Sequence, residues 1–315
     1  MSNTWQPDLL HSELIEKKLS HATLFICHYP NSDFPAIGGL RRISYPSYQA
    51  ARNDCQQLAK AMLFKAKYHA LKLSGGKAVI FCEDHKWQKH RIQILQEAAL
   101  FIDTLAGKYV TAIDMGTSPT DMDHIALITE HVCAHSSHQE TAYSTALGIF
   151  YSIQAAFNAQ GKSLTGKKVL LEGLGQVSEH LIPMLKTVEC ELFAIEINSK
   201  RMQTFSDQVK PFQPGEIIDI LCPNATGGSI TAERVKTLGC QLICGAANNQ
   251  LAPNEHVENI PCTYIPDYIA NAGGLIYVSE KINNRSDAHI AQQLQLIGNR
   301  VQQHLSDEKA PIAEC

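Results

Sequence analysis

The sequence predicts an α/β protein of two domains, and three observations lead to this prediction. The chain has 315 residues, more than a single hydrophobic core usually organises. Hydrophobic residues make up 44% and charged residues 18%, which is the composition of a folded chain. Short apolar segments alternate with longer amphipathic segments, and this alternation is typical of a parallel sheet covered by helices.

Composition and charge argue against several functions. Lys and Arg number 27 against 31 Asp and Glu, a formal net charge of -4 that offers no basic surface to nucleic acid. Residues 1–20 form no signal peptide, and no apolar run is long enough to cross a bilayer. The 10 cysteines are scattered without a C-x-x-C pair, so we interpret them as core thiols. We therefore expect a cytoplasmic protein with no membrane partner, no nucleic-acid partner and no metal.

In the first half, the pattern predicts three strands, two helices and a loop. The expected strands are 22–27, 77–82 and 109–113, the expected helices are 47–71 and 90–105, and the expected loop is 30–39. The first helix has one apolar stripe at steps of four, three and four, formed by Ala51, Cys55, Leu58 and Met62. Lys65 continues this stripe three residues later. A lysine there either extends its ammonium into water or directs it toward an anionic ligand, and periodicity alone leaves both open.

Two charged residues beside apolar strands are candidates for catalysis. Lys77 follows Ser74-Gly75-Gly76, where glycines let a ligand or another backbone come close. If Lys65 and Lys77 face the same cleft, each disfavours the charge of the other, and burial acts in the same direction, so a lysine becomes a general base near neutral pH. Asp114 stands at the end of an apolar strand. A carboxylate there suits proton transfer or pairing with an ammonium, and the alternative is an acid that caps a turn.

The second half has a more regular rhythm. We expect a helix at 142–159, strands at 168–171, 191–197, 217–221 and 241–244, and a loop or hinge at 131–143. The last helix has a single apolar stripe, formed by Ile290, Leu294, Ile297, Val301 and Leu305. Strands that alternate with helices in this way indicate a doubly wound parallel sheet.

A glycine motif lies between the first of these strands and the helix after it. Gly173 permits a tight turn, and Gly175 lets a pyrophosphate approach the N-terminus of that helix. The third position of the G-x-G-x-x-G pattern is Ser178, which is small enough for close packing. Glu196 ends the next strand, where a carboxylate binds a ribose hydroxyl and repels a 2′-phosphate. The alternative is a plain tight turn, but the full context favours a Rossmann domain that binds NAD.

Seven segments together resemble the Glu/Leu/Phe/Val amino-acid dehydrogenases, most closely the leucine dehydrogenase branch. In chain order they are IGGLR at 37–41, LSGGKAVI at 73–80, TAIDMGTSPTDMD at 111–123, TALG at 145–148, GLGQV at 173–177, GAANNQL at 245–251 and PDYIANAGGLI at 266–276. The resemblance implies a reversible, NAD-dependent oxidative deamination of an L-amino acid to a 2-oxo acid and ammonia. It also implies an N-terminal α/β catalytic domain and a C-terminal Rossmann domain with a cleft between them.

The resemblance further implies a role for each matching residue. Lys65 matches the lysine that binds the substrate carboxylate, Lys77 the lysine that activates the attacking water, and Asp114 the acid that handles the substrate amine. Further substrate contacts are implied at Gly39, Asn249, Ile37, Ala112, Leu275 and Val278. Cofactor contacts are implied at Thr145, Gly173, Gly175, Gln176, Val177, Glu196, Ile197, Ala225 and Asn248. The four side-chain pocket positions Ile37, Ala112, Leu275 and Val278 are apolar, so a branched-chain or aromatic substrate is expected and glutamate is not.

Three departures from the family pattern keep a second hypothesis open. Residues 66–70 are bulkier than the family's run of small residues, Ser74 replaces a glycine, and the loop at 135–140 is short. The alternative function is therefore a catalytically impaired homologue that binds NAD or an amino acid as a sensor or partner subunit. A hydroxy-acid dehydrogenase would need an Arg/His pair at the cleft, and the sequence offers no matching context.

The expected domain limits and assembly follow from the same comparison with the family. We expect a catalytic domain at 1–138, a Rossmann domain at 139–283, and a final helix in 284–315 that packs back towards the catalytic domain. The resemblance implies a homo-oligomer. The N-terminal strand region and the tail are short for the family, so a dimer is expected rather than an octamer.

Overall fold

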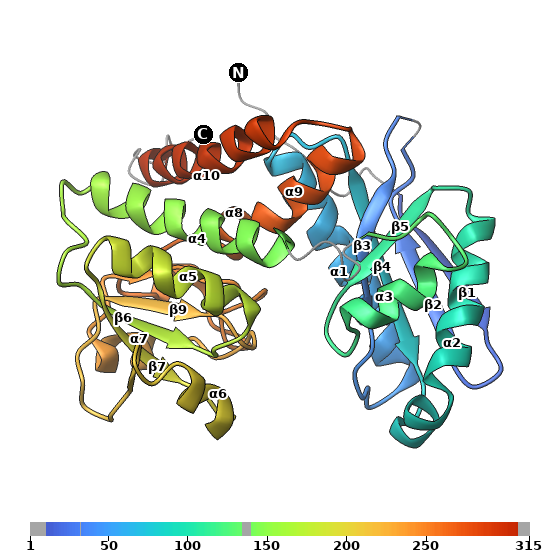
Figure 1. Cartoon of the computed structure of the whole chain (residues 1–315), viewed down its shortest axis with the longest axis horizontal. Coiled ribbons are helices and arrows are strands. Elements are labelled where there is room, and N and C mark those ends of the chain that lie inside the picture. The colour runs from blue at the N-terminus through green and yellow to red at the C-terminus, as the bar shows by residue number, and fades with distance from the viewer. Residues whose placement is uncertain (1–10, 32, 134–139, 308–315) are drawn as a thin grey trace. The chain divides into compact units, whose positions relative to one another are not determined.

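A computed structural model describes residues 11–31, 33–133 and 140–307. The chain divides into two compact units, Met1–Gln139 and Glu140–Cys315, each described here by itself (Figure 1). The short loop expected at 135–140 lies outside the described residues except for its last residue, Glu140. Within the described residues, no helix is long and apolar enough to cross a membrane.

The first unit is built on a five-stranded mixed sheet in the order β1-β2-β4-β3-β5. Its strands are β1 (Glu13–Lys18), β2 (Thr23–His28), β3 (Ala36–Arg41), β4 (Ser74–Phe81) and β5 (Tyr109–Ile113). β2 is antiparallel to β1 and β4, whereas β3 is parallel to both β4 and β5. The helices are α1 (Tyr48–Tyr68), α2 (Asp84–Thr104) and α3 (Pro119–Ala126). The helix predicted at 47–71 and the strand predicted at 109–113 are confirmed.

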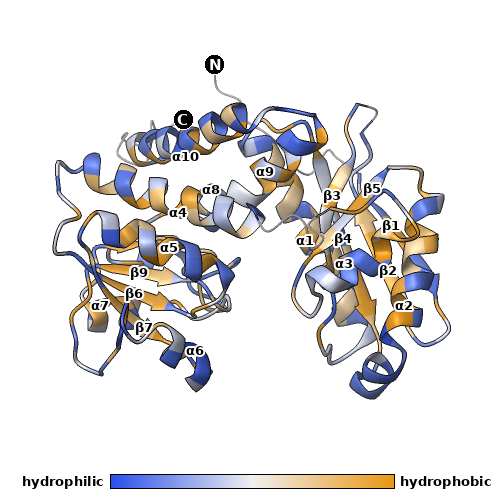
Figure 2. Cartoon of the chain, viewed as in Figure 1, coloured by the Kyte–Doolittle hydropathy of each residue, from blue (hydrophilic) through white to orange (hydrophobic). Residues whose placement is uncertain are grey.

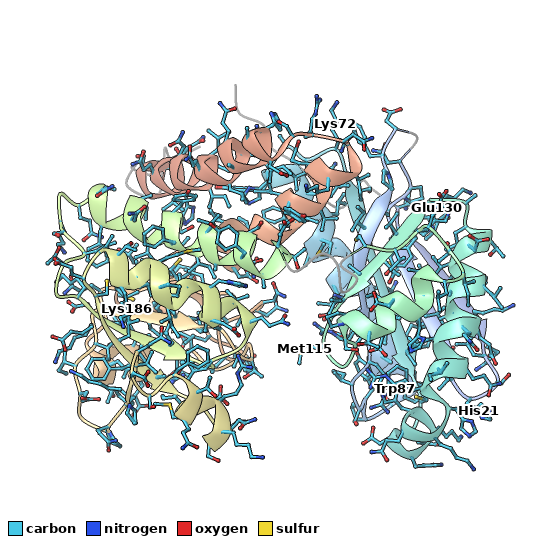
Figure 3. The ribbon with its side chains drawn as sticks, in the orientation of Figure 1. His21, Lys72, Trp87, Met115, Glu130 and Lys186 are labelled. Carbon is cyan, nitrogen blue, oxygen red and sulfur yellow. The ribbon has the colours of Figure 1, made fainter. Side chains whose placement is uncertain are left out.

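Strand β2 is buried on both faces of the sheet, and its successive residues contribute to different cores. Phe25 and Cys27 pack with α1, whereas Leu24 and Ile26 pack with α2 and α3. Trp87 of α2 belongs to the second core (Figure 3). Figure 2 shows the result, with hydrophobic strands and helices whose outer faces are hydrophilic.

Two predictions for the first unit are wrong in their bounds. The segment 30–39 is not all loop, because β3 begins at Ala36 and occupies the interior of the sheet. Gly38 and Gly39 let neighbouring strands approach closely: a Cβ on Gly38 would lie 1.7 Å from the Gly76 carbonyl oxygen. The second helix begins at Asp84 rather than residue 90, with non-helical backbone angles at His90 that interrupt its pattern.

The second unit contains a six-stranded, fully parallel sheet in the order β11-β10-β9-β6-β7-β8. Its strands are β6 (Lys168–Glu172), β7 (Glu191–Ile195), β8 (Lys210–Pro211), β9 (Ile220–Pro223), β10 (Leu242–Ile243) and β11 (Thr263–Tyr264). The order runs outward in both directions from β6, which confirms the predicted doubly wound sheet. β9 lies three residues later than expected, and β7 ends just before Glu196 instead of including it.

Helices cover this sheet and extend beyond it. They are α4 (Glu140–Asn158), α5 (Gln176–Thr187), α6 (Ser199–Thr204), α7 (Ala232–Leu238), α8 (Asp267–Ala270), α9 (Gly273–Ile282) and α10 (Asp287–Asp307), with a 3-10 turn at Val257–Asn259. The predicted stripe of α10 is its set of buried residues, Ile290, Leu294, Ile297, Val301 and Leu305. α10 contacts α4, α8 and α9 of its own unit (Figure 1). Its packing towards the first unit stays a prediction.

Candidate active site

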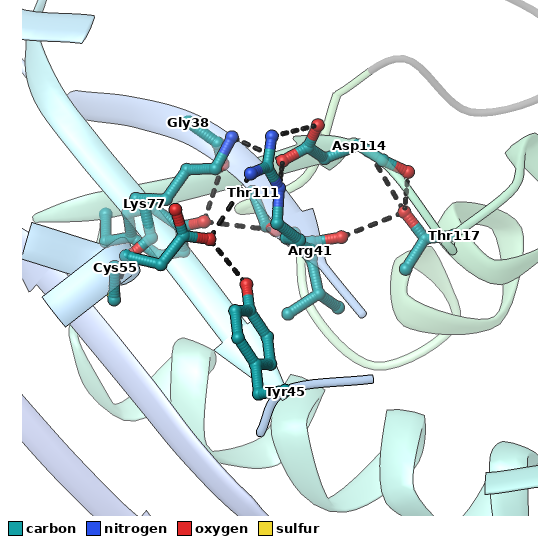
Figure 4. A network of polar contacts seen from close by, with 11 residues as sticks. Gly38, Arg41, Tyr45, Cys55, Lys77, Thr111, Asp114 and Thr117 are labelled. Atoms are coloured by element: carbon teal, nitrogen blue, oxygen red, sulfur yellow. Dashed lines mark hydrogen bonds and ion pairs between the residues drawn. The ribbon is translucent and has the colours of Figure 1, made fainter. Parts of the chain in front are cut away.

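The first unit brings Lys77 and Asp114 together. Lys77 lies within β4, and Asp114 follows the last residue of β5. Lys77 Nζ is 2.5 Å from Asp114 Oδ2, and the two side chains are only 7% and 13% exposed (Figure 4). Burial opposes ionisation of Asp114, but the positive charges of Lys77 and Arg41 outweigh it and lower the pKa of Asp114. The pair is therefore a carboxylate beside an ammonium, shielded from water.

Arg41, at the end of β3, is a site residue that the sequence analysis missed. Its Nε donates to Asp114 Oδ2 at 2.9 Å, and its Nη1 donates to Asp54 Oδ2 at 3.2 Å. Burial acts against its charge, but the carboxylates of Asp114 and Asp54 outweigh that effect and raise the pKa of Arg41. The available signal was a charged residue at the end of an apolar segment. Two glycines in the same segment, Gly38 and Gly39, favour a loop locally and obscure this signal.

The turn after β5 fixes the Asp114 backbone. The Asp114 amide donates to Thr117 Oγ1 at 3.0 Å, and that hydroxyl donates to the Leu40 carbonyl at 2.9 Å. The turn is therefore tied to the neighbouring strand β3. Ser118 then caps α3 in a reciprocal pair with Asp121. The turn is thus anchored at its start by Thr117 and at its end by the cap of α3. These contacts fix the Asp114 main chain, and the neighbouring charges hold its carboxylate.

Other predicted substrate residues of the first unit share this part of the sheet. Gly39 pairs with Ala112 in the β3–β5 register, and Ile37 lies two residues before Gly39 on the same strand. Lys65 is on α1, half-buried rather than on the fully buried stripe, which continues through Ala59 instead of Met62. Whether Lys65 and Lys77 face one ligand stays a prediction.

The glycine loop of the second unit has the form expected of a dinucleotide site. Gly173 has φ +93°, which favours glycine, and Gly175 is the N-cap of α5. A Cβ on Gly175 would meet nothing within 4 Å, so the space in front of the helix N-terminus is open. Ser178 is buried, donates to the Gly173 carbonyl at 2.6 Å and accepts from Asn224 at 3.0 Å. Serine therefore replaces the third glycine and adds local hydrogen bonds.

Glu196 lies beside this loop. Its two carboxylate oxygens accept from the Asn198 amide at 2.8 Å and the Leu174 amide at 2.7 Å. These two backbone donors are the main reason that the pKa of Glu196 is lowered. Ile197, the next residue, is fully exposed, and Ala225 lies against Gly173. The residues present fit a dinucleotide: amides at a helix N-terminus for phosphates, and an ionised acid for a ribose.

The two asparagines predicted as ligand contacts lie in a loop after β10 that other residues hold in shape. Asn249 has φ +51°, and its amide donates to Asp267 at 2.9 Å. The Asn271 side chain donates to Asn248 Oδ1 at 2.8 Å. Asp267 and Asn271 belong to the PDYIANAGGLI segment, but their supporting contacts join segments that lie apart in sequence and could not be read from it.

Thr145 lies on α4, which packs on α9, the helix that carries the expected pocket residues of the second unit. Thr145 Oγ1 accepts from the Gly274 amide at 3.2 Å. On α9, Leu275 is half-buried and Val278 is buried. Glu140, the first residue of α4, accepts from the Tyr277 hydroxyl. The start of α4 is thus attached to the helix that carries both pocket positions.

The chain matches two family models and is similar to several known proteins. The family described as "Glu/Leu/Phe/Val dehydrogenase, dimerisation domain" matches residues 12–131, and "Glutamate/Leucine/Phenylalanine/Valine dehydrogenase" matches residues 186–306. The leucine dehydrogenase of Bacillus subtilis is 33% identical over 263 residues, 79% of this chain and 72% of the relative. The chain belongs to the Glu/Leu/Phe/Val dehydrogenase family.

Other relatives agree with this placement. The L-tryptophan dehydrogenase of Nostoc punctiforme is 32% identical over 290 residues, 83% of this chain and 80% of that protein. A crystal structure of L-tryptophan dehydrogenase from Nostoc punctiforme has a TM-score of 0.77 at 27% identity, covering 96% of this chain and 91% of its own. A hetero-hexameric glutamate dehydrogenase from Thermus thermophilus shares the fold alone, with a TM-score of 0.74 at 16% identity over 96% of this chain and 83% of that one. The family comprises NAD(P)-dependent amino-acid dehydrogenases, which are oxidoreductases.

Proposed function

We propose that this protein catalyses the reversible, NAD-dependent oxidative deamination of an apolar L-amino acid, branched-chain or aromatic. The buried ion pair between Lys77 and Asp114 carries the proposal, because it places a proton acceptor beside an ammonium in a site of low water content. Family membership supports the reaction class. Named relatives act on leucine, tryptophan and phenylalanine, all of which have apolar side chains.

In the proposed reaction, an amino acid, NAD⁺ and water yield a 2-oxo acid, ammonium, NADH and a proton. When bound, NAD⁺ supplies the acceptor for the hydride that leaves the substrate Cα. Asp114 takes a proton from the substrate amine, and Lys77, in its deprotonated form, accepts a proton from the water that attacks the resulting imine. Lys65 and Asn249 bind the substrate carboxylate. The α5 N-terminus and Glu196 hold the dinucleotide.

Substrate choice follows from the residues proposed for the side-chain pocket. Ile37, Ala112, Leu275 and Val278 are all apolar, so a carboxylate side chain would be desolvated without compensation.

One observation favours the alternative of an impaired homologue. His69, inside the run that departs from the family pattern, is buried at the C-cap of α1, four residues after Lys65.

An assay of NADH formation with a panel of L-amino acids at alkaline pH separates the two. Leucine, valine, phenylalanine and tryptophan are the test substrates, and glutamate is the control for side-chain charge. We expect turnover with at least one apolar substrate and at least tenfold lower kcat/KM for glutamate, about 1.4 kcal/mol of discrimination. NAD binding without turnover of any apolar amino acid would support the impaired homologue instead.

Glu196 is proposed to make the enzyme prefer NAD to NADP. Its carboxylate is held ionised by two backbone amides, so a 2′-phosphate would meet a negative charge. Glu196→Ser is expected to raise kcat/KM for NADP relative to NAD by about tenfold or more, equivalent to about 1.4 kcal/mol. Glu191→Gln, at the opposite end of β7, is the control and should leave the ratio unchanged. An unchanged ratio in Glu196→Ser would assign cofactor choice to other residues.

We also propose that the protein is a homo-oligomer, with a dimer as the expected state. The family description of residues 12–131 as a dimerisation domain supports this. β1 lies at the edge of the first sheet, where unpaired backbone groups can join another strand. Light scattering of the purified chain would distinguish a dimer from a larger assembly.

A further inference from the structure

Asp54 is a second acidic residue beside the Arg41 guanidinium, and it comes from α1 rather than from the sheet. Its Oδ2 accepts from Arg41 Nη1 at 3.2 Å and from the Tyr45 hydroxyl at 2.5 Å (Figure 4). The Arg41 and Asp54 side chains are 11% and 27% exposed, so water screens their interaction only in part. Arg41 is therefore divided between Asp54 and Asp114.

The two oxygens of Asp114 are held unequally by this arrangement. Oδ2 receives Lys77 Nζ at 2.5 Å and Arg41 Nε at 2.9 Å, whereas Oδ1 lies 3.5 Å from Arg41 Nη2. A guanidinium that is not shared can hold both oxygens of one carboxylate through two parallel hydrogen bonds. Arg41 faces Asp114 with Nε and Nη2, making one short and one long contact, while its Nη1 is held from the other side by Asp54. Oδ1 is the more weakly held oxygen and the one suited to take a proton.

We infer that Asp54, held by Tyr45, is a positioning residue that draws Arg41 away from Asp114 and so preserves a weakly held oxygen for proton transfer. The catalytic meaning of this inference rests on the proposed function. Asp54 touches neither Lys77 nor a reacting atom in the proposed scheme. It acts through Arg41, and Tyr45 keeps its carboxylate in place.

The charges that face Asp114 support this assignment. They are the ammonium of Lys77 on β4 and the guanidinium of Arg41 on β3, with Asp54 on α1 behind Arg41. Burial raises the pKa of the neighbouring Tyr109, Cys55 and Tyr45, so these groups are neutral. Two cations thus face two carboxylates. Loss of the Asp54 charge leaves an excess positive charge, which favours release of protons from the Lys77–Asp114 pair.

The test is the pH dependence of kcat/KM for the best substrate in the deamination direction. In Asp54→Asn, the acid limb is expected to move to lower pH by about 0.5 to 1 unit. Asp54→Glu keeps the charge and should restore the wild-type limb. Asn53→Ala changes the neighbouring exposed residue of α1 and should not move it. A lower kcat in Asp54→Asn with an unmoved limb would mean a merely structural role and would overturn the inference.

Two further measurements keep the inference testable. If Asp54→Asn does not fold, Tyr45→Phe replaces it: without the hydroxyl donor, Asp54 draws Arg41 more strongly, and the limb should move to higher pH. An unmoved or lower limb in Tyr45→Phe would count against the inference.

If the wild type oxidises no amino acid, the proposed function fails. Crystal structures of the wild type and Asp54→Ala then test the inference about Asp54 by itself. In Asp54→Ala the contact between Arg41 Nη2 and Asp114 Oδ1 should shorten from 3.5 Å, and an unchanged contact overturns the inference.

Discussion

Lys77→Ala is expected to lower kcat/KM by about 10² to 10⁴-fold, the usual contribution of one general acid–base group. The variant should fold, because Arg41 still donates to Asp114 at 2.9 Å and leaves no isolated charge in the site. NAD affinity should be nearly unchanged, because the residues proposed to hold NAD belong to the second unit. Steady-state NADH formation and NAD titration followed by calorimetry measure the two effects separately.

The control for Lys77→Ala is Lys72→Ala, which removes an exposed lysine shortly before β4. It should retain wild-type kcat/KM. If Lys77→Ala keeps more than a tenth of the wild-type kcat/KM, another group activates the water, and the assignment of Lys77 fails. If NAD affinity falls together with turnover, the substitution has acted on the fold or on cofactor binding, and the proposed separation of roles between the units is wrong.

Lys77 and Asp114 could be selected as candidates from the sequence because each stands out locally. A lysine after two glycines and an acid at the end of an apolar strand are unusual against their immediate neighbours, and the structure pairs them at 2.5 Å. The same is true of Gly173 and Gly175, since their strand–loop–helix context is contiguous in sequence. Periodicity and turn chemistry detect those features whose residues all lie within one short segment of the sequence.

Residues whose importance depends on distant partners were missed. Asp54 is a polar residue in the second turn of an amphipathic helix, which by itself indicates a solvated face. Only folding brings it to Arg41, which comes 13 positions earlier in the chain, and Arg41 in turn to Asp114, 73 positions later. The strand β3 was not predicted for a related reason. Its two glycines indicate a turn locally, and their fitness for a crowded interior strand is visible only beside β4 and β5.

That crowding makes a large stability prediction. Gly38→Ala would place a Cβ 1.7 Å from the Gly76 carbonyl oxygen, a backbone atom of the adjacent strand that cannot move as a side chain can. Strands β3 and β4 are paired on both sides of this position, through Ile37 with Gly75 and Leu40 with Ala78. Relief would require these interior strands to separate. We expect a loss of about 3 kcal/mol or more in the free energy of unfolding, at the upper end for an overpacked core.

Chemical unfolding followed by circular dichroism measures this loss, with Gly298→Ala as the matched control. A Cβ on Gly298 of α10 would meet its nearest neighbour at 3.5 Å, an ordinary contact, so the same substitution should stabilise by about 1 kcal/mol through helix propensity. Opposite signs for one chemical change would show that spacing between strands, not the glycine itself, decides the outcome. Equal unfolding midpoints for Gly38→Ala and the wild type would contradict the close approach of β3 to β4. Arg41, which binds Asp114, lies on the same strand as Gly38. A shift of β3 that destabilises Gly38→Ala should therefore also lower its kcat/KM.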